Sequence, residues 1–168
     1  MIRRAVVAWL GLLLSACASA PISPDSLSGR LAVQVEGAQP RSVSAAFELR
    51  GDAGRGEMSL STPLGNMLAR ARWQAGDVRL ETPDGERRFD DLDALARETL
   101  GEAVPVVALF DWLRGRPWPG APSRPLDGPS FAQLGWIVDL SRYDDGLVDA
   151  RRVDAPVVVV RARLDATR

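Results

Sequence analysis

The sequence predicts an α+β domain in which two helices lie against one antiparallel sheet. Apolar and polar side chains alternate with a period of two from Gly29 onward, which is typical of strands with one buried face. Helical periodicity appears only between residues 90 and 115, and alternation resumes at Phe131. An order of strands, two helices and strands is typical of the α+β class. A length of 168 residues suits one domain with its own core.

Five short runs form the first block of predicted strands. They are RLAVQVEG (30–37), SVSAAFELRG (42–51), GEMSLST (56–62), MLARARW (67–73) and DVRLET (77–82). Each run alternates apolar with polar or charged side chains, and only short polar gaps separate the runs. Neighbouring runs are therefore expected to pair antiparallel. PDGE (83–86) and DDGL (144–147) supply residues that favour turns.

Two helices are predicted in the middle of the chain. The first lies within DDLDALARETLG (90–101), which has acidic residues in its first turn and ends at a glycine. The second lies within VPVVALFDWLRG (104–115) and begins near Pro105. Its wide apolar face includes Leu109, Trp112 and Leu113, so this helix needs an apolar surface to pack against.

The segment after the second helix contains five prolines between Gly115 and Ser130. Proline donates no backbone hydrogen bond, so this segment is neither a helix nor a central strand and is predicted to be a long loop. Strands resume in FAQLGWIVDLSRY (131–143), in a short run near 149–154 and in PVVVVRARLDA (156–166).

The composition excludes several classes of function. The chain has no histidine and a single cysteine, Cys17, which rules out a Ser-His-Asp triad, histidine metal ligands, a cysteine-rich zinc site and an internal disulfide. A formal net charge of -1 provides no basic surface for nucleic acid. The acidic run DDLD (90–93) lacks the glycine and glutamate of an EF-hand loop, and the adjacent Asp144 and Asp145 favour a turn over a glycosidase pair. No catalytic residue, metal site or cofactor is predicted.

The first sixteen residues have the layout of an export signal. Arg3 and Arg4 precede an uncharged, mostly apolar stretch, Ala5–Leu14, which is too short to cross a bilayer. The sequence LSAC that follows, ending at Cys17, resembles the lipobox of bacterial lipoproteins. That resemblance implies cleavage before Cys17 and acylation of this cysteine. Ala18 comes next in place of aspartate, which under the enterobacterial sorting rule favours the outer membrane.

The chain therefore divides into three predicted parts. Residues 1–16 are a lipoprotein signal peptide, and residues 17–28 are the lipidated cysteine with a flexible tether rich in small residues and proline. Residues 29–168 are a single domain. Stable attachment of such a protein to a membrane requires more than one acyl chain.

The turn LSTPLG (60–65) places a leucine where a polar residue is usual. Pro63 suits position i+1 of a type I turn and Gly65 suits position i+3, so Leu64 lies at the tip of a predicted hairpin. In a membrane-tethered protein this side chain can insert into the acyl region, where full burial contributes about 1.5–3 kcal/mol. A single exposed leucine is also common on protein surfaces, so both explanations stay open at this point.

Large apolar side chains from the strands and the second helix can either fill a core or line a ligand cavity. Trp73 and Trp136 lie in predicted strands, whereas Leu109, Trp112 and Leu113 lie in the predicted helix. Aromatic groups on both sheet and helix favour a deep apolar compartment. These five residues are candidates for the wall of an acyl-chain cavity, with a filled core as the alternative.

Taken together, these segments resemble the LolB family of outer-membrane lipoproteins. The matching pieces are LSAC (14–17), SGRLAV (28–33), LSTPLG (60–65), LFDWLRGRPWPG (109–120) and FAQLGWIVDLSRY (131–143). They are spread over nearly all of the chain that follows the signal peptide, and the resemblance rests on their order and spacing together.

The resemblance implies a fold and a function. The fold is an incomplete antiparallel β-barrel with helices covering its open side and an apolar cavity for acyl chains. The function is that of a receptor, anchored on the periplasmic face of the outer membrane, that accepts lipoproteins from a LolA-like periplasmic carrier and inserts them without an energy source. In that family an exposed leucine on a protruding loop is needed for insertion, and its counterpart here is Leu64. We expect a monomer.

Two other functions fit parts of the sequence. A structural lipoprotein that docks onto another outer-membrane assembly would have a filled core and no site for an acyl chain. A carboxylate-based hydrolase of the cell wall would need a separated acid pair, which the sequence does not provide.

Overall fold

The computed structural model describes residues 26–37, 40–102 and 104–166. The predicted signal peptide, Cys17 and most of the predicted tether lie outside the described residues. Within the described ranges, no helix has the length and apolar character needed to span a bilayer.

The chain forms strands, then two helices, then strands, which confirms the α+β prediction. The first strands are β1 (Leu27–Val35), β2 (Arg41–Gly51), β3 (Gly56–Ser61), β4 (Met67–Gln74), β5 (Asp77–Thr82) and β6 (Gly85–Phe89). Helices α1 (Leu92–Leu100) and α2 (Val106–Trp112) follow. The last strands are β7 (Ser123–Pro125), β8 (Ser130–Gln133), β9 (Trp136–Asp139), β10 (Leu147–Arg152) and β11 (Val158–Leu164), with a 3-10 turn η1 (Tyr143–Asp145) before β10.

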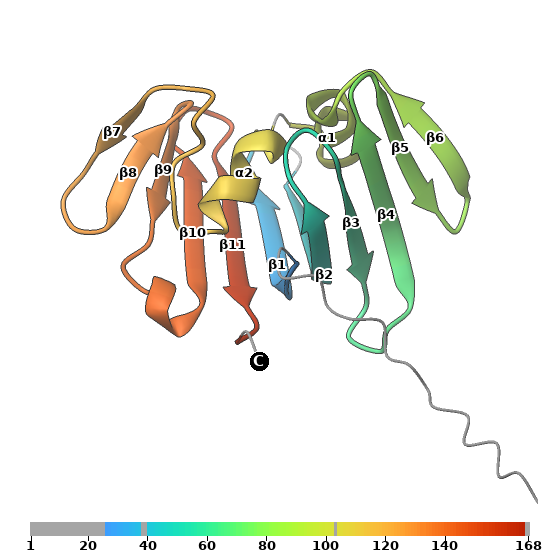
Figure 1. Cartoon of the computed structure of the whole chain (residues 1–168), viewed down its shortest axis with the longest axis horizontal. Helices are drawn as coiled ribbons and strands as arrows, with labels where there is room; N and C mark the ends of the chain where they lie inside the picture. The colour runs from blue at the N-terminus through green and yellow to red at the C-terminus, as the bar shows by residue number, and fades with distance from the viewer. Residues whose placement is uncertain (1–25, 38–39, 103, 167–168) are drawn as a thin grey trace, which may run out of the picture.

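These strands form one antiparallel sheet in the order β6-β5-β4-β3-β2-β1-β11-β10-β9-β8-β7. Strands β1 and β11, from opposite ends of the domain, pair at its centre, with Gly29 opposite Leu164. Edge strands β6 and β7 do not pair with each other in the described part of the chain, so the sheet is open. Figure 1 shows a bent sheet with β7–β10 on one flank, β3–β6 on the other, and the helices between the two flanks.

Two element boundaries differ from the sequence prediction. Strand β1 begins at Leu27, two residues before the expected start at Gly29. The proline-rich segment contains the short strand β7, which was predicted to be loop. Strand β7 pairs only with β8, so Pro125 sits at the edge of the sheet, where a missing N–H donor is tolerated.

Residues at the ends of the two helices explain where each helix begins and ends. The Asp91 carboxylate accepts a hydrogen bond from the Ala94 amide at 2.6 Å and caps α1, whereas Gly101 ends it in a left-handed conformation (φ 76°). Helix α2 follows Pro105, and a turn after it ends at Gly115, also left-handed (φ 73°). Asp91 of the acidic run therefore serves as a helix cap.

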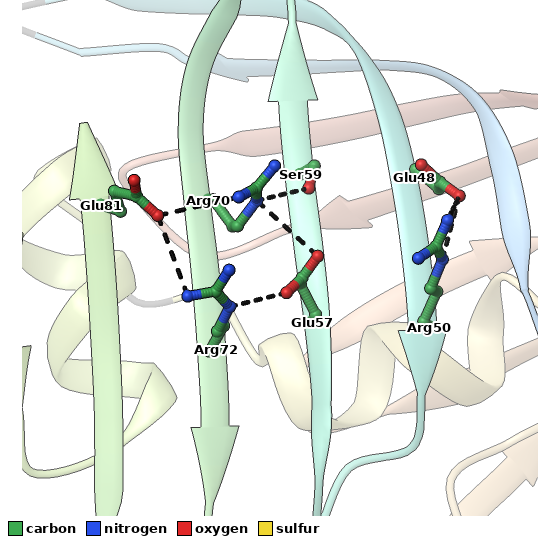
Figure 2. Close-up of polar contacts among 7 residues, drawn as sticks. All are labelled: Glu48, Arg50, Glu57, Ser59, Arg70, Arg72 and Glu81. Carbon is green, nitrogen blue, oxygen red and sulfur yellow. Dashed lines mark hydrogen bonds and ion pairs between the residues drawn. The ribbon is translucent and has the colours of Figure 1, made fainter. Parts of the chain in front are cut away.

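The inner and outer faces of the sheet have opposite character. The inner-face residues pack with apolar residues of both helices into one buried cluster. On the outer face, Glu57, Arg70, Arg72 and Glu81 form a network of ion pairs across β3, β4 and β5, in which Arg72 Nε lies 2.7 Å from Glu57 Oε2 (Figure 2). That hydrogen bond raises the pKa of Arg72. Such exposed pairs add little stability, but they identify the solvated face.

Candidate functional site

A cavity of about 250 Å³ lies between the inner face of β1–β5 and the two helices. Its walls are apolar except for two threonines, Thr82 and Thr99. The other lining residues are Leu31, Val33, Val43, Ala45, Met58, Leu60, Ala69, Ala71, Trp73, Leu80, Leu92, Leu95, Ala96, Leu100, Val104, Val106 and Leu109. Apolar cavities of this order stay dry and take up apolar molecules, so this space suits hydrocarbon better than water.

Small side chains leave this space open. Ala45 on β2, Ala71 on β4 and Ala96 on α1 all face the cavity from different elements. Ala45 and Ala71 lie on the inner face of the sheet and Ala96 lies on the helix opposite, so a larger residue at any of the three would project into the void. Small side chains at these inward positions thus help to leave the space open.

Two of the five predicted cavity residues, Trp73 and Leu109, lie in its wall. The Trp73 ring packs against Phe110 at a centroid distance of 4.9 Å, and its indole N–H donates to the Asp52 carbonyl at 2.8 Å. Because one edge of the indole is satisfied by the β2–β3 turn, its apolar face can border the cavity at no hydrogen-bonding cost.

The other three predicted residues, Trp112, Leu113 and Trp136, do not line this cavity. Trp112 is only 1% exposed, and its ring centroid lies 5.9 Å from that of Trp136 and 6.5 Å from that of Phe131. These rings fill the space between α2 and strands β8 and β9. The helix therefore uses one part of its apolar surface for the cavity and another for a solid core.

Gln133 is a buried polar residue that the sequence analysis did not single out. Its Oε1 accepts from Trp112 Nε1 at 2.8 Å and from the Trp118 amide at 3.0 Å. Its Nε2 donates to the carbonyls of Trp118 and Ala121, each at 2.8 Å. The side chain therefore fixes the proline-rich segment to the sheet and to α2. The sequence did contain a signal for this buried polar residue, since a glutamine occupies an inward position of the strand two residues after the apolar Phe131.

The β3–β4 hairpin presents Leu64 at its tip, with 89% of the residue exposed. The Gly65 amide donates to the Thr62 carbonyl at 2.9 Å, which is the i to i+3 bond expected with Pro63 at i+1. The Asn66 amide donates to the Thr62 hydroxyl at 3.2 Å, and the Thr62 amide donates to the Asn66 carbonyl at 2.9 Å. Gly65 is left-handed (φ 85°), as this turn requires. The tip is thus held by its own hydrogen bonds.

The hairpin and the rim of the cavity lie at the same end of the strands. Ser61, which precedes the hairpin, is opposite Ala46 of β2, so the hairpin extends alongside the first residues of β2. Val43, in this first part of β2, lines the cavity and is 40% exposed. An apolar opening therefore lies close to an apolar tip.

Comparison with known families identifies the chain. A family model described as outer membrane lipoprotein LolB matches residues 25–165. The chain belongs to the LolB family. Membership places it among the lipid-anchored proteins of the outer membrane.

Several curated relatives named outer-membrane lipoprotein LolB align over most of the chain. The one from Bordetella petrii is 37% identical over 172 residues, covering 91% of this chain and 86% of the relative. That from Chromobacterium violaceum is 35% identical and covers 86% of each. A third, from Thiobacillus denitrificans, is 33% identical and covers 98% of this chain and 94% of the relative. The alignment with these LolB proteins thus covers both the residues that line the cavity and the residues of the solid core around Trp112.

Proposed function

We propose that this LolB-family chain is the outer-membrane receptor that accepts lipoproteins from a LolA-like periplasmic carrier and inserts them into the outer membrane. The observation that carries the proposal is the pairing of an apolar cavity with an exposed apolar hairpin tip at one end of the sheet. The activity is binding and release, in which no covalent bond is broken.

The cavity is the site for the acyl chains of the incoming lipoprotein. Each methylene removed from water there contributes about 0.8 kcal/mol. Trp73 and Leu109 form part of the wall, and α1 and α2 cover the open side of the sheet over it. Transfer from the carrier requires only a higher affinity at the receptor, about 1.4 kcal/mol for each factor of ten. No nucleotide is needed for such a downhill step.

Leu64 contacts the membrane when the lipoprotein is released. Lipidated Cys17 holds the domain at the bilayer, and the tether lets the hairpin reach the lipid surface. Pro63 and Gly65 shape the turn, and the hydrogen bonds of Thr62 keep the leucine at the tip. An exposed leucine has a favourable apolar environment only when the hairpin enters lipid.

The structural-lipoprotein alternative is not favoured. It predicts a core without room for an acyl chain, whereas the interior contains the apolar space described above. The decisive experiment mixes a chain lacking residues 1–16, with Cys17→Ala, with a carrier–lipoprotein complex of proven activity. A pull-down then identifies the protein that holds the lipoprotein. Movement to the receptor without nucleotide is expected, and retention on the carrier would overturn the proposal.

Leu64→Glu separates acceptance from insertion. A charge at the tip cannot enter lipid, so insertion into liposomes should fall at least about tenfold, in line with the burial energy of one leucine. Acceptance from the carrier should stay within about twofold, because residue 64 is outside the cavity lining. Leu134→Glu is the matched control, since Leu134 is an exposed leucine (47%) in the β8–β9 turn. If both variants and the wild type insert lipoproteins into liposomes equally well, Leu64 has no role in insertion.

A further inference from the structure

A second pocket, of about 340 Å³, adjoins the apolar cavity at the end of α1. It is lined by the end of β1 and the two residues after it, the first residue of β2, the end of α1 with the two residues that follow, and Pro156. Its walls include charged groups, Glu36, Arg41 and Glu102, where those of the cavity have none. We call it the polar subsite.

Three elements run from the cavity into the polar subsite. On β1, Leu31 and Val33 line the cavity and Val35 lines the subsite. On β2, Val43 lines the cavity and Arg41, two residues earlier and on the same face, lines the subsite. Leu100 of α1 borders both spaces. The wall thus changes from apolar to charged along β2, from Val43 to Arg41, and just past the ends of β1 and α1, at Glu36 and Glu102. The surface of an amphiphile changes in the same way from chain to head.

Arg41, which is exposed, is the basic side chain among the residues that line the subsite. In the described ranges no carboxylate lies within ion-pair distance of its guanidinium, Glu36 included. The Glu102 carboxylate is already engaged, at 2.8 Å from Arg152 Nη2, which also donates to the Pro156 carbonyl at 2.7 Å. The Arg41 guanidinium lies against Gly101, where an added β-carbon would come within 3.0 Å of its Nη1. The glycine at the helix end therefore makes room for the guanidinium.

We propose that the polar subsite binds the ester and amide groups at the head of a diacylglyceryl lipid whose chains occupy the cavity, with Arg41 donating hydrogen bonds to the carbonyl oxygens. This inference rests on the proposed function, since it requires acyl chains in the cavity. A guanidinium presents several N–H donors in a planar fork, which suits neighbouring carbonyl oxygens. Glu36 supplies an acceptor for an amide N–H, and the two carboxylates of the subsite disfavour a phosphate.

Photo-crosslinking locates both ends of the ligand on the full, anchored chain in liposomes of phosphatidylethanolamine and phosphatidylglycerol. The probe is a synthetic diacylglyceryl-cysteine peptide with a diazirine either beside the ester groups or at the end of one acyl chain. Mass spectrometry is expected to find the head label on residues near Arg41 and Gly101 and the chain label near Trp73 and Leu109. A phosphatidylglycerol probe with the same labels distinguishes a membrane phospholipid from an acylated protein as the source of the head.

Arg41→Gln is expected to reduce the head-label yield in the subsite about five- to tenfold, because hydrogen bonds from a charged donor are worth more than neutral ones. The chain-label yield in the cavity should change less than twofold. Arg124→Gln is the matched control, because it removes the same charge from edge strand β7, away from both pockets.

The outcomes separate this inference from the proposed function. A chain label in the cavity with a head label scattered over the surface, or with a head label unaffected by Arg41→Gln, overturns the polar subsite alone. Absence of the chain label from the cavity in wild type overturns the acyl-chain site and the subsite with it. Stronger head labelling by the phospholipid than by the peptide overturns the assignment to an acylated protein.

Discussion

The interior of the domain has a hollow half and a filled half, although one sheet and two helices supply both. The hollow half lies between β1–β5 and the helices, where alanines at positions 45, 69, 71 and 96 face a cavity. The filled half lies between α2 and β8–β9, where Trp112, Phe131 and Trp136 pack ring against ring. Small inward side chains thus border the hollow half, whereas aromatic rings occupy the filled half.

The two halves divide the tasks of stability and binding. Close packing around Trp112 and its hydrogen bond to Gln133 supplies a rigid support. Residues that line a void lose van der Waals contacts on that side. The filled half must therefore supply the stability that the hollow half lacks. This view predicts that equivalent substitutions have different costs in the two halves.

The largest expected effect comes from truncating one tryptophan in each half. Trp112→Ala should lower the free energy of unfolding by about 3–5 kcal/mol, because it empties a packed site and removes the donor to Gln133. Trp73→Ala should cost about 1 kcal/mol less, because Trp73 already borders a cavity. Urea unfolding followed by far-UV circular dichroism measures both. An equal or larger cost for Trp73→Ala would contradict the division into a hollow and a filled half.

A smaller effect is expected from adding volume to each half. Ala150→Leu places extra methylenes on β10 next to the filled half, where residue 150 is paired with Val138 of β9 and is 1% exposed, and should cost about 1–3 kcal/mol. Ala71→Leu projects into the cavity, so its cost in unfolding free energy should stay below about 1 kcal/mol.

The same pair of variants tests the use of the cavity. Ala71→Leu should weaken binding of a fluorescent acyl-chain probe by about tenfold or more, because it occupies the space for the chain, whereas Ala150→Leu should not. Fluorescence titration measures this directly. Unchanged probe binding by a folded Ala71→Leu variant would show that the chain binds elsewhere.

Much of the fold was predictable because the relevant signals are local. Alternation along each run gives the inner and outer faces of the strands, and the acidic start and Gly101 define α1. The hairpin tip was also predictable, since Pro63, Leu64 and Gly65 are consecutive. Strand β7 escaped prediction because proline is excluded from central strands but tolerated at an edge, and sequence does not show which strand lies at an edge.

The cavity was only partly predictable, because its existence depends on residues distant in sequence. Alternation shows that Ala45 and Ala71 point inward, but it does not show that they face the same space as Ala96. Large aromatic residues were the natural candidates for the wall, yet Trp112 and Trp136 pack against each other. Which side chains pack against each other across the interior is set by the tertiary structure. The cavity volume is the small difference between the volume that the backbone encloses and the summed volume of the side chains that fill it.

The smallest effect is expected at the surface, where the two halves should behave alike. The Asp52 carboxylate, beside the hollow half, accepts hydrogen bonds from the amides of Arg55 and Gly54, and these lower its pKa from 3.8. The Asp139 carboxylate, on β9, accepts from the backbone amide and the side chain of Ser141, which lowers its pKa from 3.8 as well. In both cases hydrogen bonds from backbone amides of a turn stabilise the charged form of the carboxylate.

Because both folded-state pKa values lie below the unfolded value, each carboxylate stabilises the fold fully above pH 3.8 and loses this contribution as the pH falls through its folded-state pKa. Asp52→Asn and Asp139→Asn should therefore each lower stability slightly near pH 7, where the charged carboxylate contributes fully, and flatten the acid limb of the stability curve. NMR titration of the two carboxyl carbons provides the direct measurement. A midpoint at or above 3.8 for one residue alone would show that the difference between the halves extends to their surfaces.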